Sequence, residues 1–193
     1  MDKHQDSFFD KWESFEFPES TDDFWDFLAE HYPDDWYVLD YIPAQMKDNK
    51  KYSQIEVRYP SEEYGVAYSN YNRIEESFLR VLILLWGFYD SRCETEVNLD
   101  ILNSDIECIS SKDISHDGIA IKLVSIENLL VYKRLIQLSL REKTTHMIFF
   151  AEAEIIIWVG GLCAEVFTRK KDTINLLTRI ATTEGLYLWK KEP

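Results

Sequence analysis

Apolar runs and turn signals alternate most closely between residues 146 and 167, and this stretch predicts the centre of a sheet. Met147–Ala151 and Ile155–Val159 have strand length, are rich in β-branched and aromatic residues, and are separated by three residues. The pair Gly160-Gly161 can adopt positive φ, so residues 162–168 are predicted to return as a third strand. Because Ile155–Val159 shows no polar alternation, we expect a central strand covered on both faces.

Apolar residues recur at helical spacing in three other segments, two before this stretch and one after it. The candidate N-caps of these helices are Asn72 with Glu75 as its capping-box partner, either Ser125 or Asn128, and Asp172. The first helix is predicted to run to Tyr89 and, because its last turns are apolar almost all round, to be buried. The last helix is predicted to end at Gly185.

The remaining pattern predicts shorter strands and an α-helical N-terminal layer. Aromatic stripes interrupted by Pro18 and Pro33 predict two amphipathic helices before residue 36. Strands are predicted at Trp36–Ile42, Ile55–Tyr59, Glu96–Leu102, Gly118–Val124 and Leu186–Trp189. Ser110–Asp117 is predicted to be a polar loop, and Tyr64–Tyr71 fits either a strand or a tight loop.

Together these elements predict an α+β fold in which a largely antiparallel mixed sheet has a central C-terminal hairpin and helices packed on one face. We expect one domain over residues 1–193, because no linker rich in Pro, Gly or Ser divides the chain. Residues 1–35 are expected to form an acidic, aromatic and helical N-terminal segment. Residues 36–193 are expected to form the body of sheet and helices.

Charge distinguishes the N-terminal segment from the body. The chain has 35 Asp and Glu against 21 Lys and Arg, which gives a formal net charge of −14. Thirteen of the acidic residues and only two of the basic ones lie within residues 1–40, so that stretch carries −11 and the rest −3. Eleven aromatic residues in the same stretch argue against disorder, because an acidic segment with that many rings can still bury apolar surface.

Composition also limits the partners and the compartment. The net charge of −14 disfavours nucleic acids and anionic membranes as partners. No signal-peptide pattern precedes the acidic residues, and the longest apolar run, Val81–Tyr89, is far shorter than the roughly 20 residues that span a bilayer. Cys93, Cys108 and Cys163 are odd in number and lack CxxC spacing, as expected of reduced, buried thiols. We therefore predict a cytoplasmic protein.

The sequence contains none of the catalytic or metal-binding patterns that can be read from spacing alone. The four histidines, His4, His31, His116 and His146, are isolated from one another and lack zinc-ligand spacing, and His116 and His146 are expected at the surface. Neither a nucleophile elbow nor a phosphate-binding loop occurs. Glu152 and Glu154 lie in the predicted hairpin loop, which favours solvated carboxylates over an acid–base pair. We predict no catalytic residue, metal or cofactor.

The acidic segment offers a candidate partner-binding site instead. Its carboxylates surround aromatic residues, and the selected residues are Asp22, Asp23, Asp26, Glu30, Asp34, Asp35, Trp36 and Tyr37. In such a site Trp and Tyr anchors supply affinity, while carboxylates speed the association with a basic protein. The alternative is that the carboxylates form a solvated face and the aromatic rings belong to the core.

In size and composition the chain resembles the acidic immunity proteins that bacteria make to neutralise nuclease toxins. That resemblance implies a partner whose active surface is built for phosphates and is occluded by carboxylates. We therefore expect a non-enzymatic binding protein of immunity or antitoxin type with a basic toxin domain as its partner. The alternatives are a small enzyme of unrecognised mechanism and a structural or regulatory adaptor. The oligomeric state does not follow from the pattern.

Overall fold

Eight strands form one sheet in the part of the chain that the structure, a computed structural model, describes: residues 28–30, 32–47, 68–95, 107–112 and 121–191. The strands are β1 (Trp36–Asp40), β2 (Arg92–Thr95), β3 (Glu107–Lys112), β4 (Ile121–Ser125), β5 (His146–Phe150), β6 (Ile155–Val159), β7 (Cys163–Thr168) and β8 (Tyr187–Lys190). Their order is β3-β4-β2-β5-β6-β7-β1-β8, and every neighbouring pair is antiparallel. The predicted α+β fold with its antiparallel sheet is confirmed.

The predicted hairpin lies at the middle of this sheet. Strand β6 pairs with β5 on one side and β7 on the other, and all of its residues except Trp158 are buried. A short 3-10 turn, η3 (Ala151–Ala153), joins β5 to β6 and ends at Glu154, whose φ is 50°. The turn into β7 uses Gly161 at a φ of 64°, where a residue without Cβ avoids strain. The prediction of a central strand covered on both faces is therefore confirmed.

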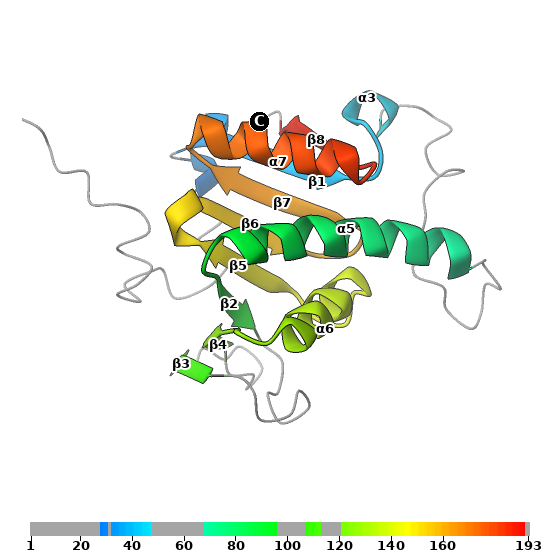
Figure 1. Ribbon diagram of the computed structural model, residues 1–193. Coiled ribbons are helices and arrows are strands. Elements are labelled where there is room, and N and C mark those ends of the chain that lie inside the picture. Colours follow the sequence, from blue (N-terminus) through cyan, green and yellow to red (C-terminus); the bar gives the residue numbers. More distant parts are fainter. Residues whose placement is uncertain (1–27, 31, 48–67, 96–106, 113–120, 192–193) are drawn as a thin grey trace, which may run out of the picture.

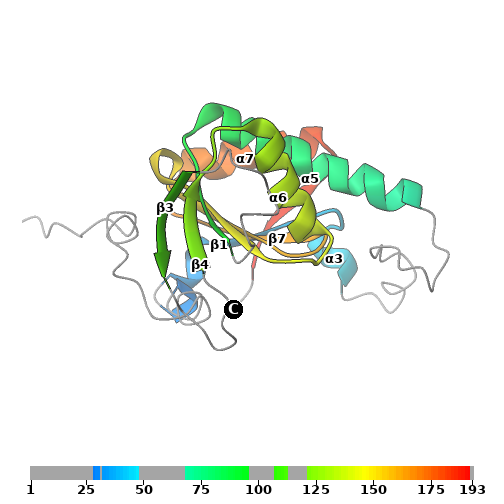
Figure 2. The same cartoon turned by 90° about the horizontal axis from the view of Figure 1, so that it is seen from below.

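Three helices, α5 (Tyr68–Phe88), α6 (Leu129–Leu140) and α7 (Lys171–Thr183), cover one face of the sheet (Figures 1 and 2). Helix α5 lies between the other two (Figure 1). Asn128, one of two predicted caps, begins α6 by accepting hydrogen bonds from the backbone of Leu130 and Val131. Within the described ranges, no helix is both long enough and apolar enough to cross a membrane.

The predicted start of α5 is wrong. The helix begins at Tyr68, so Asn72 lies exposed within it, and the last residues of the ambiguous Tyr64–Tyr71 stretch are helical. Glu75 is not a capping-box residue either, because its carboxylate accepts hydrogen bonds from Arg141 at the end of α6. The last turns are not buried all round: Phe88 is 66% exposed.

Other element boundaries differ by a few residues from the sequence predictions. The first three residues of the expected loop Ser110–Asp117 belong to β3, whose pairing with β4 was not visible locally. Helix α7 begins at Lys171, so Asp172 is a first-turn residue and not the cap. Strands β4 and β8 confirm the strands expected near residues 118–124 and 186–189. Ile55–Tyr59, Glu96–Leu102 and the first of the two helices expected before residue 36 lie outside the described residues, and of the second helix the described residues 28–30 are helical.

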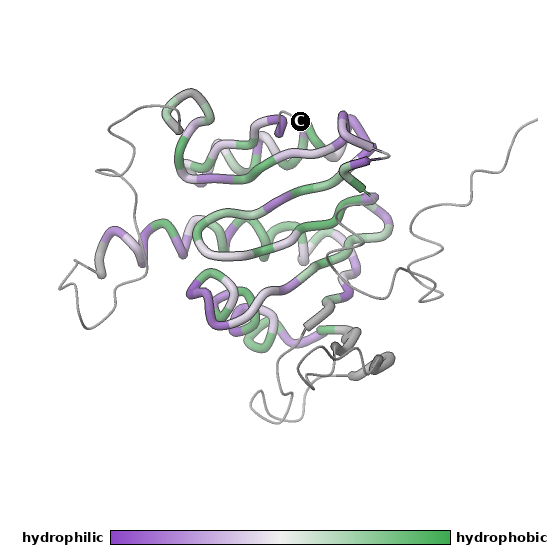
Figure 3. Tube along the Cα trace, turned by 180° about the vertical axis from the view of Figure 1, so that it is seen from behind, coloured by the Kyte–Doolittle hydropathy of each residue, from purple (hydrophilic) through white to green (hydrophobic). Residues whose placement is uncertain are grey.

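Apolar side chains pack on both faces of the sheet. The larger core lies between the sheet and the three helices. The second core, on the opposite face, joins Leu28 and Trp36 to side chains of the central strands, namely Met147, Phe149, Ile156 and Phe167. Figure 3, which views the molecule from behind, shows the apolar stretches along the middle strands. The described end of the N-terminal segment thus packs on the face that α5, α6 and α7 leave open.

Candidate partner-binding surface

Among the described residues of the acidic segment, Leu28 is the one whose side chain is buried. Residues 28–30 are helical, and Leu28 is fully buried in the second core while Glu30 is exposed. Three of the eight predicted site residues, Asp22, Asp23 and Asp26, precede this turn and lie outside the described residues. Glu30 is therefore the one selected carboxylate before η1 whose position the structure gives.

Asp34 and Asp35 form ion pairs within the chain. Both belong to η1 (Pro33–Asp35), which leads into β1 between β7 and β8. In β8, Nζ of Lys190 lies 2.6 Å from Oδ1 of Asp34. Just after β7, Nε of Arg169 lies 4.0 Å from Oδ2 of Asp35. The hydrogen bond from Lys190 lowers the pKa of the Asp34 carboxyl, whereas burial raises the pKa of Asp35 against the opposing charge of Arg169. These two carboxylates are thus engaged by the protein's own cations.

Trp36 and Tyr37 do not form exposed anchors. Trp36 is 8% exposed and lies in the second core, because the register of β1 sets it beside Phe167. The ammonium group of Lys191 lies 4.2 Å from the centre of the Trp36 ring. Tyr37 points to the other face and is half-buried against the larger core, and this burial raises the pKa of its hydroxyl. For Trp36 the core interpretation therefore replaces the predicted role as an anchor.

The basic residues around η1 were missed by sequence reasoning. Besides pairing with Asp35, Arg169 lies over the ring of Tyr32 at 5.1 Å, and Tyr32 in turn contacts Phe167 edge to face. Lys191 pairs with Glu165 at 2.9 Å. The contacts of Arg169 and Tyr32 join segments more than 130 residues apart, and Lys191 and Glu165 are 26 residues apart, so no local pattern predicts them. They fasten residues 32–36 to the sheet.

The described residues are electrically balanced. They contain sixteen Asp and Glu and sixteen Lys and Arg, so their formal charges cancel. The whole net charge of −14 therefore belongs to the other segments of the chain. Residues 1–27, with nine acidic residues against two lysines, account for −7 of it. The other −7 is divided among residues 48–67, 96–106, 113–120 and 192–193.

One predicted surface histidine is buried. His146, at the start of β5, is 1% exposed, because it shares the helix-covered face with Ile148 and Phe150. The surface prediction for His146 is therefore wrong, and His116 lies outside the described residues. Cys93 is buried as expected, whereas Cys163 is partly exposed.

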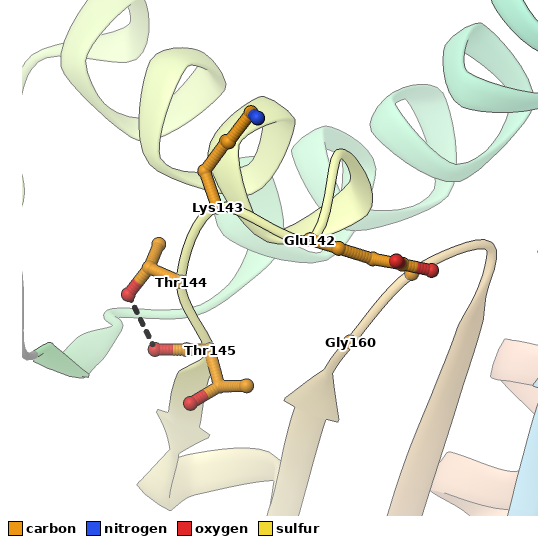
Figure 4. Close-up of a pocket in the computed structure, with 6 residues that line it drawn as sticks. Glu142, Lys143, Thr144, Thr145 and Gly160 are labelled. Atoms are coloured by element: carbon orange, nitrogen blue, oxygen red, sulfur yellow. Dashed lines mark hydrogen bonds between the residues drawn. The ribbon is translucent and has the colours of Figure 1, made fainter. Parts of the chain in front are cut away.

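A groove of about 400 Å³ lies where the loop after α6 meets the turn between β6 and β7. Its lining residues are Glu142, Lys143, Thr144, Thr145, Gly160 and Gly161 (Figure 4). In the close-up the Glu142 side chain extends across the glycine turn, while Lys143 points away. The six residues offer one carboxylate, one ammonium group and two hydroxyls, without a histidine or thiol to form a nucleophile–base pair.

Glu142 occupies a position that usually belongs to glycine. Its φ is 56°, and its N–H donates to the Ser139 carbonyl while the next N–H donates to Leu138, which is the usual closure of a helix by a left-handed residue. Glu142→Gly should therefore stabilise the fold by about 0.5 to 1 kcal/mol, as measured by urea unfolding. Glu142→Ala is the control, because it removes the carboxylate but keeps Cβ. An equal gain in the Ala variant would assign the effect to charge and contradict backbone strain.

Comparisons of this chain with models of protein families, with curated proteins and with solved structures find no match. The function must therefore be inferred from the residues and their arrangement.

Proposed function

We propose that this protein is a non-enzymatic binding protein of immunity or antitoxin type, which occludes the active surface of a basic, nuclease-like toxin domain. The observation that supports it most is the uneven distribution of charge: residues 1–40 carry −11 of the chain's net charge of −14, and the other 153 residues carry −3. Half of the excess lies in residues 1–27. A concentrated negative segment attracts a basic partner and orients the encounter.

The contacts around β1 support a narrower choice of the carboxylates that would attract a partner. Asp34 and Asp35 already pair with Lys190 and Arg169, so they contribute less to attraction at a distance. Glu30 is exposed, and the sequence supplies Asp22, Asp23 and Asp26 just before it. We therefore narrow the proposed electrostatic site to these four carboxylates.

Occlusion requires contact but no chemistry on the part of this protein. The active surface of a nuclease holds cations and hydrogen-bond donors arranged for phosphate oxygens, and carboxylates can bind the same groups. The buried anchors Leu28 and Trp36 hold the body end of the acidic segment against the sheet. A fixed attachment lowers the conformational entropy that the segment loses when it binds.

The test is the kinetics of binding to the protein that the neighbouring gene encodes, which we expect to contain a basic toxin domain. A variant with Asp22→Asn, Asp23→Asn, Asp26→Asn and Glu30→Gln should associate about tenfold more slowly and with a flatter salt dependence. Its melting temperature should change little, because exposed charges contribute little to stability. Surface plasmon resonance at a low and a high salt concentration measures both rates.

The matched control removes the same number of charges from the body. Glu76→Gln, Asp90→Asn, Glu142→Gln and Glu152→Gln all lie at exposed positions. Equal slowing by both variants would show that only net charge matters, which contradicts a localised site. An unchanged rate and salt slope in the first variant would make the acidic segment a solvated face. Cytochrome c serves as the basic protein that should show no saturable binding.

A further inference from the structure

Strand β8 is the last strand of the described sheet, and there it has a neighbouring strand on one side only. It pairs with β1 and with no other described strand, while β3 lies at the opposite end of the sheet (Figure 1). The outer side of such a strand presents backbone N–H and C=O groups that can pair with another strand. We call the outer side of Tyr187–Lys190 the β8 edge.

One hydrogen bond shows which backbone groups lie on the β8 edge. The N–H of Lys191 donates to the Trp36 carbonyl at 2.9 Å, and the register of β8 with β1 continues from there without a break. In an antiparallel pair, alternate residues of a strand bond to the partner strand. Trp189 therefore bonds to β1, while the N–H and C=O groups of Leu188 and Lys190 point away from β1. Within the described residues these four groups have no hydrogen-bond partner.

The β8 edge is not closed against a second strand. Proteins prevent pairing at sheet edges with free lysines, prolines and bulges. The ammonium groups here are already bound by the protein's own carboxylates, Lys190 by Asp34 and Lys191 by Glu165. Strand β8 contains no proline, and its register with β1 has no bulge. The edge is therefore open to regular strand pairing.

We propose that the β8 edge forms a homodimer by pairing antiparallel with β8 of a second copy, with the two-fold axis at Trp189. In this register Leu188 lies opposite Lys190 of the second copy, and Lys190 lies opposite its Leu188. Each of these two pairs exchanges two backbone hydrogen bonds. All four outward groups on each copy are then paired, and the two sheets become one continuous sheet. Such a contact is complementary to itself, as a two-fold interface requires.

Side chains on the face opposite the helices support this register. Lys191 lies over the ring of Trp36, which belongs to the second core. Because side chains alternate along a strand, Tyr187 and Trp189 share this face with Lys191. The axis brings Trp189 against its counterpart in a non-hydrogen-bonded pair, where cross-strand side chains approach most closely. Tyr187, which is 47% exposed, lies opposite Lys191 of the second copy, and an aromatic ring attracts a cation.

A second copy paired through β8 fits this edge better than two other occupants. Strand β3 of another copy has an irregular register between Cys108 and Ser110, which disrupts pairing, and a head-to-tail contact of β8 with β3 builds open chains of molecules. A basic toxin domain gains little attraction here, because the nearby carboxylates, Asp34 and Glu165, are already paired. The proposal thus stands independently of the proposed binding to a toxin domain.

A proline at position 190 tests the backbone pairing. The wild-type protein should be dimeric in sedimentation equilibrium at submillimolar concentration. Lys190→Pro removes an outward N–H from each copy and should weaken self-association about tenfold or more. The fold should persist, because this N–H does not bond to β1, and circular dichroism melting curves establish that it does. Lys190→Ala is the matched control: it removes the same ammonium group but keeps the N–H, so its affinity should stay within about twofold of the wild type.

Cysteine cross-linking tests the position of the axis. The two copies of Trp189 face each other directly, so Trp189→Cys should form a disulfide-linked dimer under mild oxidation. The two copies of Lys190 are offset by two positions, about 7 to 8 Å apart, which is beyond the reach of a disulfide. Lys190→Cys should therefore not exceed the background of the wild type, in which Cys163 is partly exposed. Non-reducing electrophoresis measures the cross-linked fraction.

A monomeric wild type overturns the proposal, and so does a dimer whose affinity Lys190→Pro leaves unchanged. Cross-linking of Lys190→Cys in preference to Trp189→Cys contradicts the register and with it the proposed axis. If Lys190→Pro does not fold, the two cysteine variants decide the question. If the wild type is monomeric and Lys190→Pro loses binding to the product of the neighbouring gene, the β8 edge belongs to that partner and the proposal is again overturned.

Discussion

Ile156→Ala is expected to destabilise the fold by about 2 to 5 kcal/mol, the range for emptying a filled core position. Ile156 is fully buried in the middle of the sheet. Its cross-strand neighbours on the same face are Phe149 and Phe167, and Leu28 belongs to the same cluster. Phe149, Phe167 and Leu28 are held by three separate elements and cannot move into the space that the Ile156 side chain leaves, so most of the cavity remains. Urea unfolding followed by tryptophan fluorescence measures the change.

Neighbouring substitutions act as controls for this prediction. Ile156→Val should cost only about 1 kcal/mol, because one methylene is removed. Ile157→Ala should cost about as much as Ile156→Ala, since Ile157 is fully buried on the helix side of the same strand. Trp158→Ala should cost less than its size suggests, because Trp158 is only partly buried. Fast amide exchange across Ile155–Val159 would contradict the central position of β6.

Arg141→Met should be the most disruptive single change among the ion pairs, with an expected loss of about 3 kcal/mol. The Arg141 guanidinium donates two hydrogen bonds to the Glu75 carboxylate, from Nε to Oε1 at 2.6 Å and from Nη2 to Oε2 at 2.8 Å. Glu75 is 4% exposed, so the variant leaves its carboxylate buried without the guanidinium. The bond also joins α5 to the end of α6, and its loss therefore loosens the contact between these helices.

A double-mutant cycle separates the interaction energy between Glu75 and Arg141 from the contribution of each residue alone. Glu75→Leu combined with Arg141→Met should recover most of the lost stability, because an apolar pair needs no compensating charge. Arg141→Lys should recover only part of it, because an ammonium group cannot bind both oxygens in the same geometry. A loss below about 0.5 kcal/mol for Arg141→Met would mean that water reaches Glu75, which contradicts the burial of the pair.

Local patterns predicted the elements that depend on residues close in sequence. The β5–β6–β7 hairpin was predicted because apolar runs, short breaks and a Gly-Gly turn occur within about twenty residues. Asn128 was a correct cap for the same reason. Asn72 and Asp172 carried the same cap signal and were wrong, because helices α5 and α7 begin at earlier residues. A cap signal is a local preference, which packing of the flanking turns can override.

The sequence by itself determined the fold class, the central hairpin, the helices packed on one face and the concentration of acidic residues before β1. It left two features to the tertiary structure. The insertion of β1 between β7 and β8 brings Arg169 and Lys190 to Asp35 and Asp34, and so removes two carboxylates from the predicted site. The antiparallel packing of α5 and α6 brings Arg141 to Glu75. Both depend on contacts between segments distant in the chain, and strand order and helix register are set by the summed burial of the whole core and not by any local signal.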